Sequence, residues 1–147
     1  MNQLKEYIPT NPPKRAAGTK ILGIKSRNPI DLEDQLRKGL EYSSFRNLAQ
    51  KLEISEAALG ELIEISYDTL QRRRRNGRFN LNESETLYRV ARILERSEEL
   101  LGEEAKAWLR EPVLALGNRT PLSISARAIG SELVLNLIGR LEHGVYS

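Results

Sequence analysis

The stretch of sequence that decides the fold is residues 55–77, SEAALGELIEISYDTLQRRRRNG. It opens on Ser55, a good N-cap residue, and apolar residues at helical spacing follow until Ile65. Ser66 can cap a second helix, which we expect to run from Tyr67 to Arg75 and to stop at the Asn-Gly pair that follows. Two short helices joined by a turn of about three residues, the second basic on its outer face, are typical of a helix-turn-helix.

The second helix of this unit is the expected DNA-reading element. Its main apolar residue is Leu70, so its exposed face is almost wholly cationic. Side chains near the start of a recognition helix reach base edges in the major groove, and arginines meet phosphates or a guanine edge. Four consecutive arginines directly after a turn favour DNA over the alternative of a solvated charge run. The predicted DNA-binding residues are Ser66, Tyr67, Thr69, Gln71, Arg72, Arg73, Arg75 and Arg78.

The turn between the two helices carries one unfavourable residue. Glu64 stands where a glycine is usual. The turn therefore either avoids positive φ or holds Glu64 in a strained conformation.

Outward from this unit, composition and apolar spacing place the other segments. Residues 1–27 mix three prolines with lysines and arginines, a composition that predicts a mobile basic arm. Asn82 with Glu85 resembles a capping box and predicts a long helix, reaching about Leu101, that joins two halves of the chain. The other expected helices are Asp31 to Leu40, Ser43 to Leu52, Glu103 to Arg110 and Ser131 to Leu141.

No strand is convincingly signalled, so we predict an all-α fold in which a helix-turn-helix DNA-binding domain precedes a small helical domain. The predicted divisions are a mobile arm at 1–27, the helix-turn-helix domain with its connecting helix at 28–101, and the second domain at 102–147. In the second domain, Leu133 and Leu137 are expected in the core. Val145 and Tyr146 follow the last helix and suggest a partner surface as readily as a docked terminus.

The overall composition suits one compact core, or two small domains that share one. The 147 residues include no cysteine, which excludes a disulfide framework and fits a reducing compartment. We find neither a secretory signal nor a run of about 18 apolar residues, so we expect a cytoplasmic protein without membrane contact. The net charge of +3 is unevenly distributed: residues 66–78 hold five arginines against one aspartate, and residues 95–111 hold six glutamates against three basic residues. The first segment suits an anionic partner.

The residues needed for catalysis are mostly missing. With no cysteine and one histidine, His143, neither a thiol nucleophile nor a multi-histidine metal site can be built. The glutamate pairs 98–99 and 103–104 are adjacent on a helix, do not face each other, and are better explained as a solvated face. No glycine-rich phosphate loop is present. We therefore predict no enzyme activity, catalytic residue, metal or cofactor, and a small hydrolase centred on His143 is the remote alternative.

Several motifs resemble a known family. Leu62 to Ser66, Thr69 to Gly77 and Leu87 to Ala91 look like the DNA-binding half of Xre-type antitoxins from RES toxin-antitoxin modules. The second half is similar to the Xre/MbcA/ParS toxin-binding domain of that family in Ala107-Trp108-Leu109, Pro112, Ala115 to Leu122 and Leu137 to Tyr146. The resemblance covers roughly residues 40–147. The chain departs from it between Ser123 and Gly130, where the family usually carries acidic residues.

The resemblance implies an antitoxin that neutralises a RES-domain toxin, an enzyme that depletes NAD, and that represses its own operon. One helix-turn-helix covers about half of a two-fold operator, so we expect a homodimer on operator DNA. The alternative is a stand-alone transcriptional regulator whose C-terminal half only dimerises. The expected toxin-binding residues are Trp108, Arg119, Arg140, Glu142, His143, Val145 and Tyr146.

Overall fold

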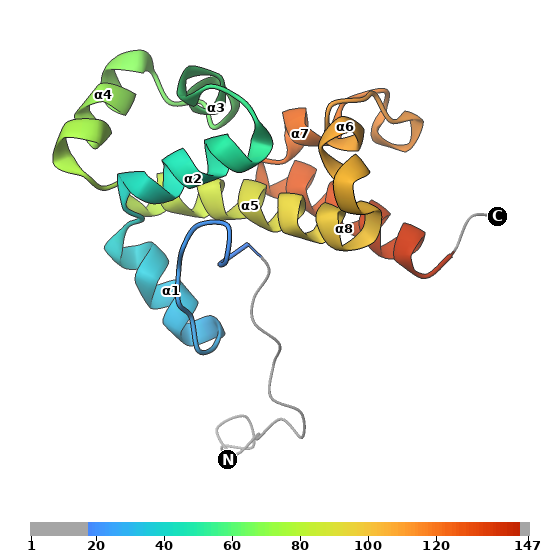
Figure 1. The fold of residues 1–147 in the computed structure, drawn as a ribbon, viewed down its shortest axis with the longest axis horizontal. Helices are drawn as coiled ribbons and strands as arrows, with labels where there is room; N and C mark the ends of the chain where they lie inside the picture. The colour runs from blue at the N-terminus through green and yellow to red at the C-terminus, as the bar shows by residue number, and fades with distance from the viewer. Residues whose placement is uncertain (1–17, 145–147) are drawn as a thin grey trace, which may run out of the picture.

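The computed structural model describes residues 18–144, and every regular element in that range is a helix, which confirms the all-α prediction. Figure 1 shows the long α5 crossing the middle of the molecule, with α1 to α4 toward one end and α6 to α8 toward the other. The helices in chain order are α1 Pro29–Lys38, α2 Tyr42–Leu52, α3 Glu56–Leu62, α4 Tyr67–Asn76, α5 Leu81–Leu101, η1 Gly102–Glu104, α6 Ala105–Leu109, η2 Leu114–Leu116, α7 Pro121–Ile124 and α8 Ala128–Glu142.

Helix α5 begins at a capping box formed by Asn80 and Glu83. The Asn80 side chain accepts the Glu83 amide N–H at 2.8 Å, and the Glu83 carboxylate accepts the Asn80 amide N–H at 2.9 Å. The predicted box of Asn82 with Glu85 is therefore wrong by two residues, because both registers present an Asn-x-x-Glu pattern. Phe79 decides between them, since its burial just before Asn80 fixes where the chain enters the helix.

One core extends along both sides of α5. Leu87, Val90 and Leu94 of this helix are fully buried, and α5 packs against α1, α2, α6 and α8. Burying an aliphatic side chain of this size contributes roughly 1.5–3 kcal/mol each. The two halves of the chain thus share a single hydrophobic core through α5, and the prediction that this helix joins them is confirmed.

The segment just before α1 differs from the expectation of a mobile arm over residues 1–27. Leu22 is 1% exposed, Ile21 and Ile24 are also buried, and the Leu22 carbonyl accepts the Ser44 hydroxyl at 2.6 Å. The amide of Gly18 donates to the carboxylate of Glu95. The prediction of an exposed arm followed the basic and proline-rich composition of the whole segment and overlooked these three apolar residues, which belong to the core. Residues 1–17, the rest of the predicted arm, lie outside the described residues.

The C-terminal half contains α7, which the sequence analysis missed, and an α8 that begins earlier than predicted. Gly130 lets α8 approach α7, because a Cβ there would lie 2.0 Å from the Ile124 carbonyl oxygen. In this orientation Val134 and Leu137 are buried, whereas Leu133 is 50% exposed. The expectation of a buried Leu133 is therefore wrong, since it lies off the stripe that faces α5, and that of a buried Leu137 is confirmed.

Candidate nucleic-acid interface

Helices α3 and α4 form the predicted helix-turn-helix. The Ser55 hydroxyl caps α3 by accepting the Ala58 amide at 3.0 Å, and the Ser66 hydroxyl caps α4 by accepting the Thr69 amide at 3.2 Å. Leu70 of α4 is buried against α3, where a Cβ at position 60 would lie 3.2 Å from the Leu70 side chain. These contacts fix the angle at which α4 leaves the core.

The turn between α3 and α4 is made by a strained residue. Glu64 has φ of 60°, the left-handed conformation that glycine usually supplies, and its amide donates to the Glu61 carbonyl at 3.0 Å. Its carboxylate is ion-paired with Arg127, which precedes α8. Of the two possibilities that the sequence left open, the turn therefore adopts the strained Glu64 conformation, which costs roughly 1–2 kcal/mol.

Helix α2 holds the start of α3 in place through Tyr42. The Tyr42 hydroxyl donates to the Glu56 carboxylate at 2.5 Å, and the Tyr42 ring stacks on Phe79 and lies tilted against Phe45. Burial, together with the hydrogen bond to Glu56, raises the pKa of Tyr42 to about 12. The phenol therefore stays a neutral donor at physiological pH and holds the start of α3 in place.

The outer face of α4 is cationic, as predicted. At about 100° per residue, Arg72 and Arg75 lie roughly opposite the buried Leu70, and both side chains are exposed. Tyr67 is 72% exposed at the start of the helix, while Gln71 is half-buried. Arg74 is also exposed, although the sequence analysis did not select it.

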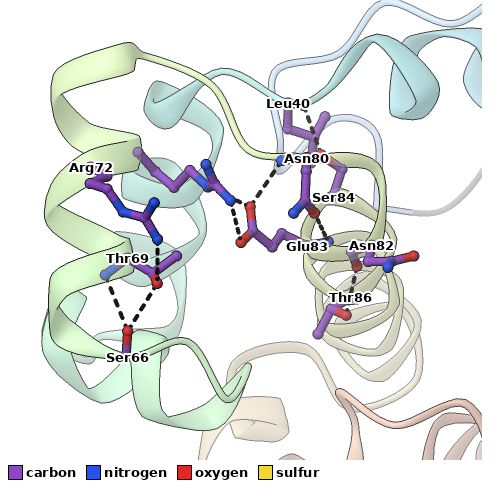
Figure 2. Close-up of polar contacts among 10 residues, drawn as sticks. Leu40, Ser66, Thr69, Arg72, Asn80, Asn82, Glu83, Ser84 and Thr86 are labelled. Carbon is purple, nitrogen blue, oxygen red and sulfur yellow. Dashed lines mark hydrogen bonds and ion pairs between the residues drawn. The ribbon is translucent and has the colours of Figure 1, made fainter.

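Ser66 and Thr69, two of the predicted DNA-binding residues, make hydrogen bonds within α4 and its N-cap. The Ser66 hydroxyl caps α4 and donates to the Thr69 hydroxyl at 2.9 Å, and the Arg72 guanidinium donates to that same Thr69 oxygen at 3.2 Å (Figure 2). Ser66 and Thr69 therefore shape the beginning of the recognition helix. Arg72 is drawn toward that end, where a recognition helix approaches the bases.

Two of the predicted phosphate-binding arginines contact other residues of the protein, although the Arg78 side chain is still 43% exposed. Arg73 donates two hydrogen bonds to Glu83, at 2.8 and 3.1 Å, and the side chains of the pair are only 21% and 13% exposed. Arg78 donates to the Gly39 carbonyl at 2.7 Å and pairs with Glu41 at 3.3 Å. Arg73 follows Leu70 by three residues and lies on the same side of α4, so it faces α5. Its partner Glu83 also belongs to the capping box with Asn80, which is drawn in Figure 2. The exposed cations of α4 are thus Arg72, Arg74 and Arg75.

We expect Arg73→Ala to lower the free energy of unfolding by about 1–3 kcal/mol, because it leaves Glu83 partly buried and without its cation. The salt dependence of DNA binding should stay unchanged. Arg75→Ala is the matched control: it should change stability by less than about 0.5 kcal/mol and lower the salt slope by about one. Urea unfolding and DNA titrations across salt measure both. A stable Arg73 variant with a reduced salt slope would contradict the assignment.

The predicted partner-binding residues of the C-terminal half fall into separate places. Trp108 of α6 is half-buried against the core, and Arg119 is exposed between η2 and α7. Arg140 and His143 are exposed at the far end of α8, about 20 Å along the helix from its start. Glu142 is tied back to Arg96 of α5 at 2.7 Å. Val145 and Tyr146 lie outside the described residues.

An apolar pocket beside the start of α8 was not predicted from the sequence. It has a volume of about 570 Å³ and is lined by residues of η2, α7 and α8, chiefly Leu116, Ile124, Ile129 and Leu133. Ile129 is 73% exposed. These residues lie within 116–133 but belong to three separate elements, so the apolar spacing of a single helix does not predict the pocket.

Residues 18–144 lack the features of two other kinds of site. That range contains no cluster of three or more histidine or acidic residues placed to hold a metal ion. Among the same residues, no helix is both long and apolar enough to cross a membrane.

The fold and its cationic α4 define a helix-turn-helix DNA-binding protein with a second helical domain on the same core. Comparison with known families matches residues 31–92 to the antitoxin Xre-like helix-turn-helix domain. Residues 96–144 match the antitoxin Xre/MbcA/ParS C-terminal toxin-binding domain, so the two matched segments meet within α5.

Individual relatives support the same family. The chain is 32% identical over 148 residues to Antitoxin Xre of Yersinia enterocolitica serotype O:8 / biotype 1B, covering 98% of this chain and all of the relative. It is 38% identical over 74 residues to Antitoxin Xre of Photorhabdus laumondii subsp. laumondii, covering 48% of this chain and 50% of the relative. The Prs ADP-ribosylating antitoxin of a Sphingobium species is 18% identical over 132 residues, covering 82% and 83%. The chain belongs to the Xre antitoxin family.

Proposed function

We propose that this protein is the antitoxin of a type II toxin-antitoxin pair, which binds and inhibits a RES-domain toxin that depletes NAD. The observation that carries the proposal is the match of residues 96–144 to a toxin-binding domain, on the same core as a helix-turn-helix. The chain acts by binding rather than by catalysis. The RES class follows the resemblance of its sequence motifs to RES-associated antitoxins. The word "ADP-ribosylating" in the name of the Sphingobium relative agrees with a partner that uses NAD.

The end of α8 has the chemistry to block an NAD-consuming pocket. Such a pocket offers a flat apolar surface to the aromatic rings of its cofactor and hydrogen-bonding groups to its polar parts, so a plug needs a flat ring beside polar groups. Arg140 and His143 are exposed at the end of α8, and Tyr146 follows them in the sequence. Aromatic and arginine side chains are the usual anchors of protein interfaces.

We also propose that the protein represses its own operon as a cytoplasmic homodimer. Each copy would place the outer face of α4, with Arg72 and Arg75, in the major groove of one half-site. Arg74 is exposed but follows Leu70 by four residues, so it would reach a phosphate from the flank of α4. The operator is then an inverted repeat whose half-sites are about one helical turn apart, or a multiple of that spacing. Contacts from two copies double the number of neutralised phosphates.

The toxin half of the proposal is tested with the product of the reading frame next to this gene, which we expect to be a RES-domain protein. We expect the two proteins to co-purify and a molar excess of this chain to stop NAD consumption by the toxin. A stand-alone regulator would leave NAD consumption unchanged while still binding the operator. That outcome, with a folded protein at saturating concentration, would contradict the proposal.

A further inference from the structure

The apolar pocket between η2, α7 and α8 is a second surface that the role of the α8 end does not use. Ile129 and Leu133 stand four residues apart on the same face of α8 and are 73% and 50% exposed. A surface helix normally turns such residues toward the core, and contiguous exposed apolar patches mark binding sites. Here that face borders a hollow of about 570 Å³.

The walls of the pocket are fixed by backbone contacts. The Val113 amide donates to the Arg119 carbonyl at 3.1 Å and closes the loop that carries η2. On the other side, Gly130 brings the α8 backbone directly against the carbonyl of Ile124, with no room for a side chain. The hollow therefore exists before a partner arrives, which lowers the entropic cost of binding.

The charges at the rim indicate what the pocket accepts. Arg119 and Arg127 are the charged residues that line it. Arg119 folds back over Gly117 and reaches the Leu116 carbonyl at 3.5 Å, and Arg127 pairs with the exposed Glu64. Arg127 is therefore already neutralised and Arg119 supplies the uncompensated positive charge, so a fitting occupant is an aliphatic or aromatic side chain with a carboxylate beside it.

We propose that this pocket is a docking site for the toxin and receives an apolar side chain from an acidic patch of the toxin surface. The proposal rests on the proposed function, and the pocket lies wholly within residues 96–144, the segment matched to the toxin-binding domain. A second copy of this chain fits less well, because a two-fold contact brings the same patch of both copies together and sets Arg119 and Arg127 against their own counterparts.

The pocket and the end of α8 then have separate tasks. Leu133 and Arg140 are separated by seven residues, or about 10 Å along the helix. The pocket supplies affinity through a buried apolar anchor, and the end of α8 enters the toxin's active site. Loss of the pocket contact should therefore weaken binding while leaving inhibition complete at saturating protein.

The test is toxin affinity of the full-length double variant Ile129→Ser/Leu133→Ser, measured by titration with the purified RES-domain toxin. We expect its Kd to rise about 30- to 100-fold, the effect of losing an interface hot spot. Both residues are largely exposed, so the melting temperature and operator affinity should stay at wild-type values. Ile30→Ser is the matched control, since Ile30 is 75% exposed on α1, and it should leave the Kd unchanged.

A second variant, Arg119→Glu, tests the rim and should raise the toxin Kd without changing the fold. Wild-type toxin affinity in both the double variant and the Arg119 variant would show that the pocket is not the docking site, while the proposed function would still stand. A wild-type protein that failed to bind the toxin would overturn the proposed function itself. A double variant that bound toxin normally but lost self-association in light scattering would assign the pocket to a second copy and overturn the proposal.

Discussion

Combined replacement of Arg72, Arg74 and Arg75 by alanine is expected to weaken operator binding by about 10²–10³-fold per copy at about 0.1 M salt. Each arginine that neutralises a phosphate releases condensed counterions, and the gain in affinity falls as salt rises. The three side chains are exposed on α4, whereas Arg73 is held by Glu83. The loss should therefore come from these three residues without loss of stability.

The slope of log affinity against log salt is the decisive measurement. It should fall by about three units for each bound copy and by about six for a homodimer on an inverted repeat, so it also counts the protomers. The matched control removes three exposed cations elsewhere, Arg37, Lys51 and Arg92, and should change the slope little. A triple α4 variant with the wild-type slope would show that α4 is not the DNA-binding element.

The recognition unit could be predicted closely because its signals are local. Ser55 and Ser66 cap the two helices, and both caps are present in the structure. The inward side chain of Arg73 was also within reach of the sequence, since a residue three positions after the buried Leu70 shares its face. The sequence did not show that Arg73 pairs with Glu83, because the capping box that includes Glu83 was predicted two residues too late.

Other features depend on contacts between distant segments and could not be read locally. Leu22 enters the core from a stretch whose basic composition indicates an exposed arm, because Ser44 binds its carbonyl and Gly18 fixes the start of the segment on α5. The apolar pocket joins residues of three elements, and the exposure of Leu133 depends on how Gly130 seats α8 on α7. The spacing of apolar residues identified α8 as amphipathic, but it did not determine whether residues at the border of the apolar face, such as Leu133, are buried or exposed.

The largest effect on the toxin side is expected from removing residues 144–147. The shortened protein keeps the Arg96–Glu142 ion pair at 2.7 Å and the buried Leu137, so α8 should remain folded on α5 and operator binding should be unchanged. Neutralisation should fail even at saturating antitoxin, with toxin activity in the complex at least about 30-fold above that of the wild-type complex, because the segment proposed to fill the active site is gone.

Leu137→Asp is the contrasting control for this truncation, because a charge at a buried position of α8 should disrupt folding of the C-terminal half and abolish toxin binding altogether. The truncated protein should instead still bind the toxin through the α7–α8 pocket, with its far-ultraviolet circular dichroism intact, while NAD consumption continues in the complex. Arg140→Ala should produce a milder form of the same result, since Arg140 is exposed and lies in the last turn of α8. Complete protection of NAD by the truncated protein, at wild-type toxin affinity, would mean that residues 144–147 do not enter the active site and that inhibition arises from the surface around Arg119 and the pocket.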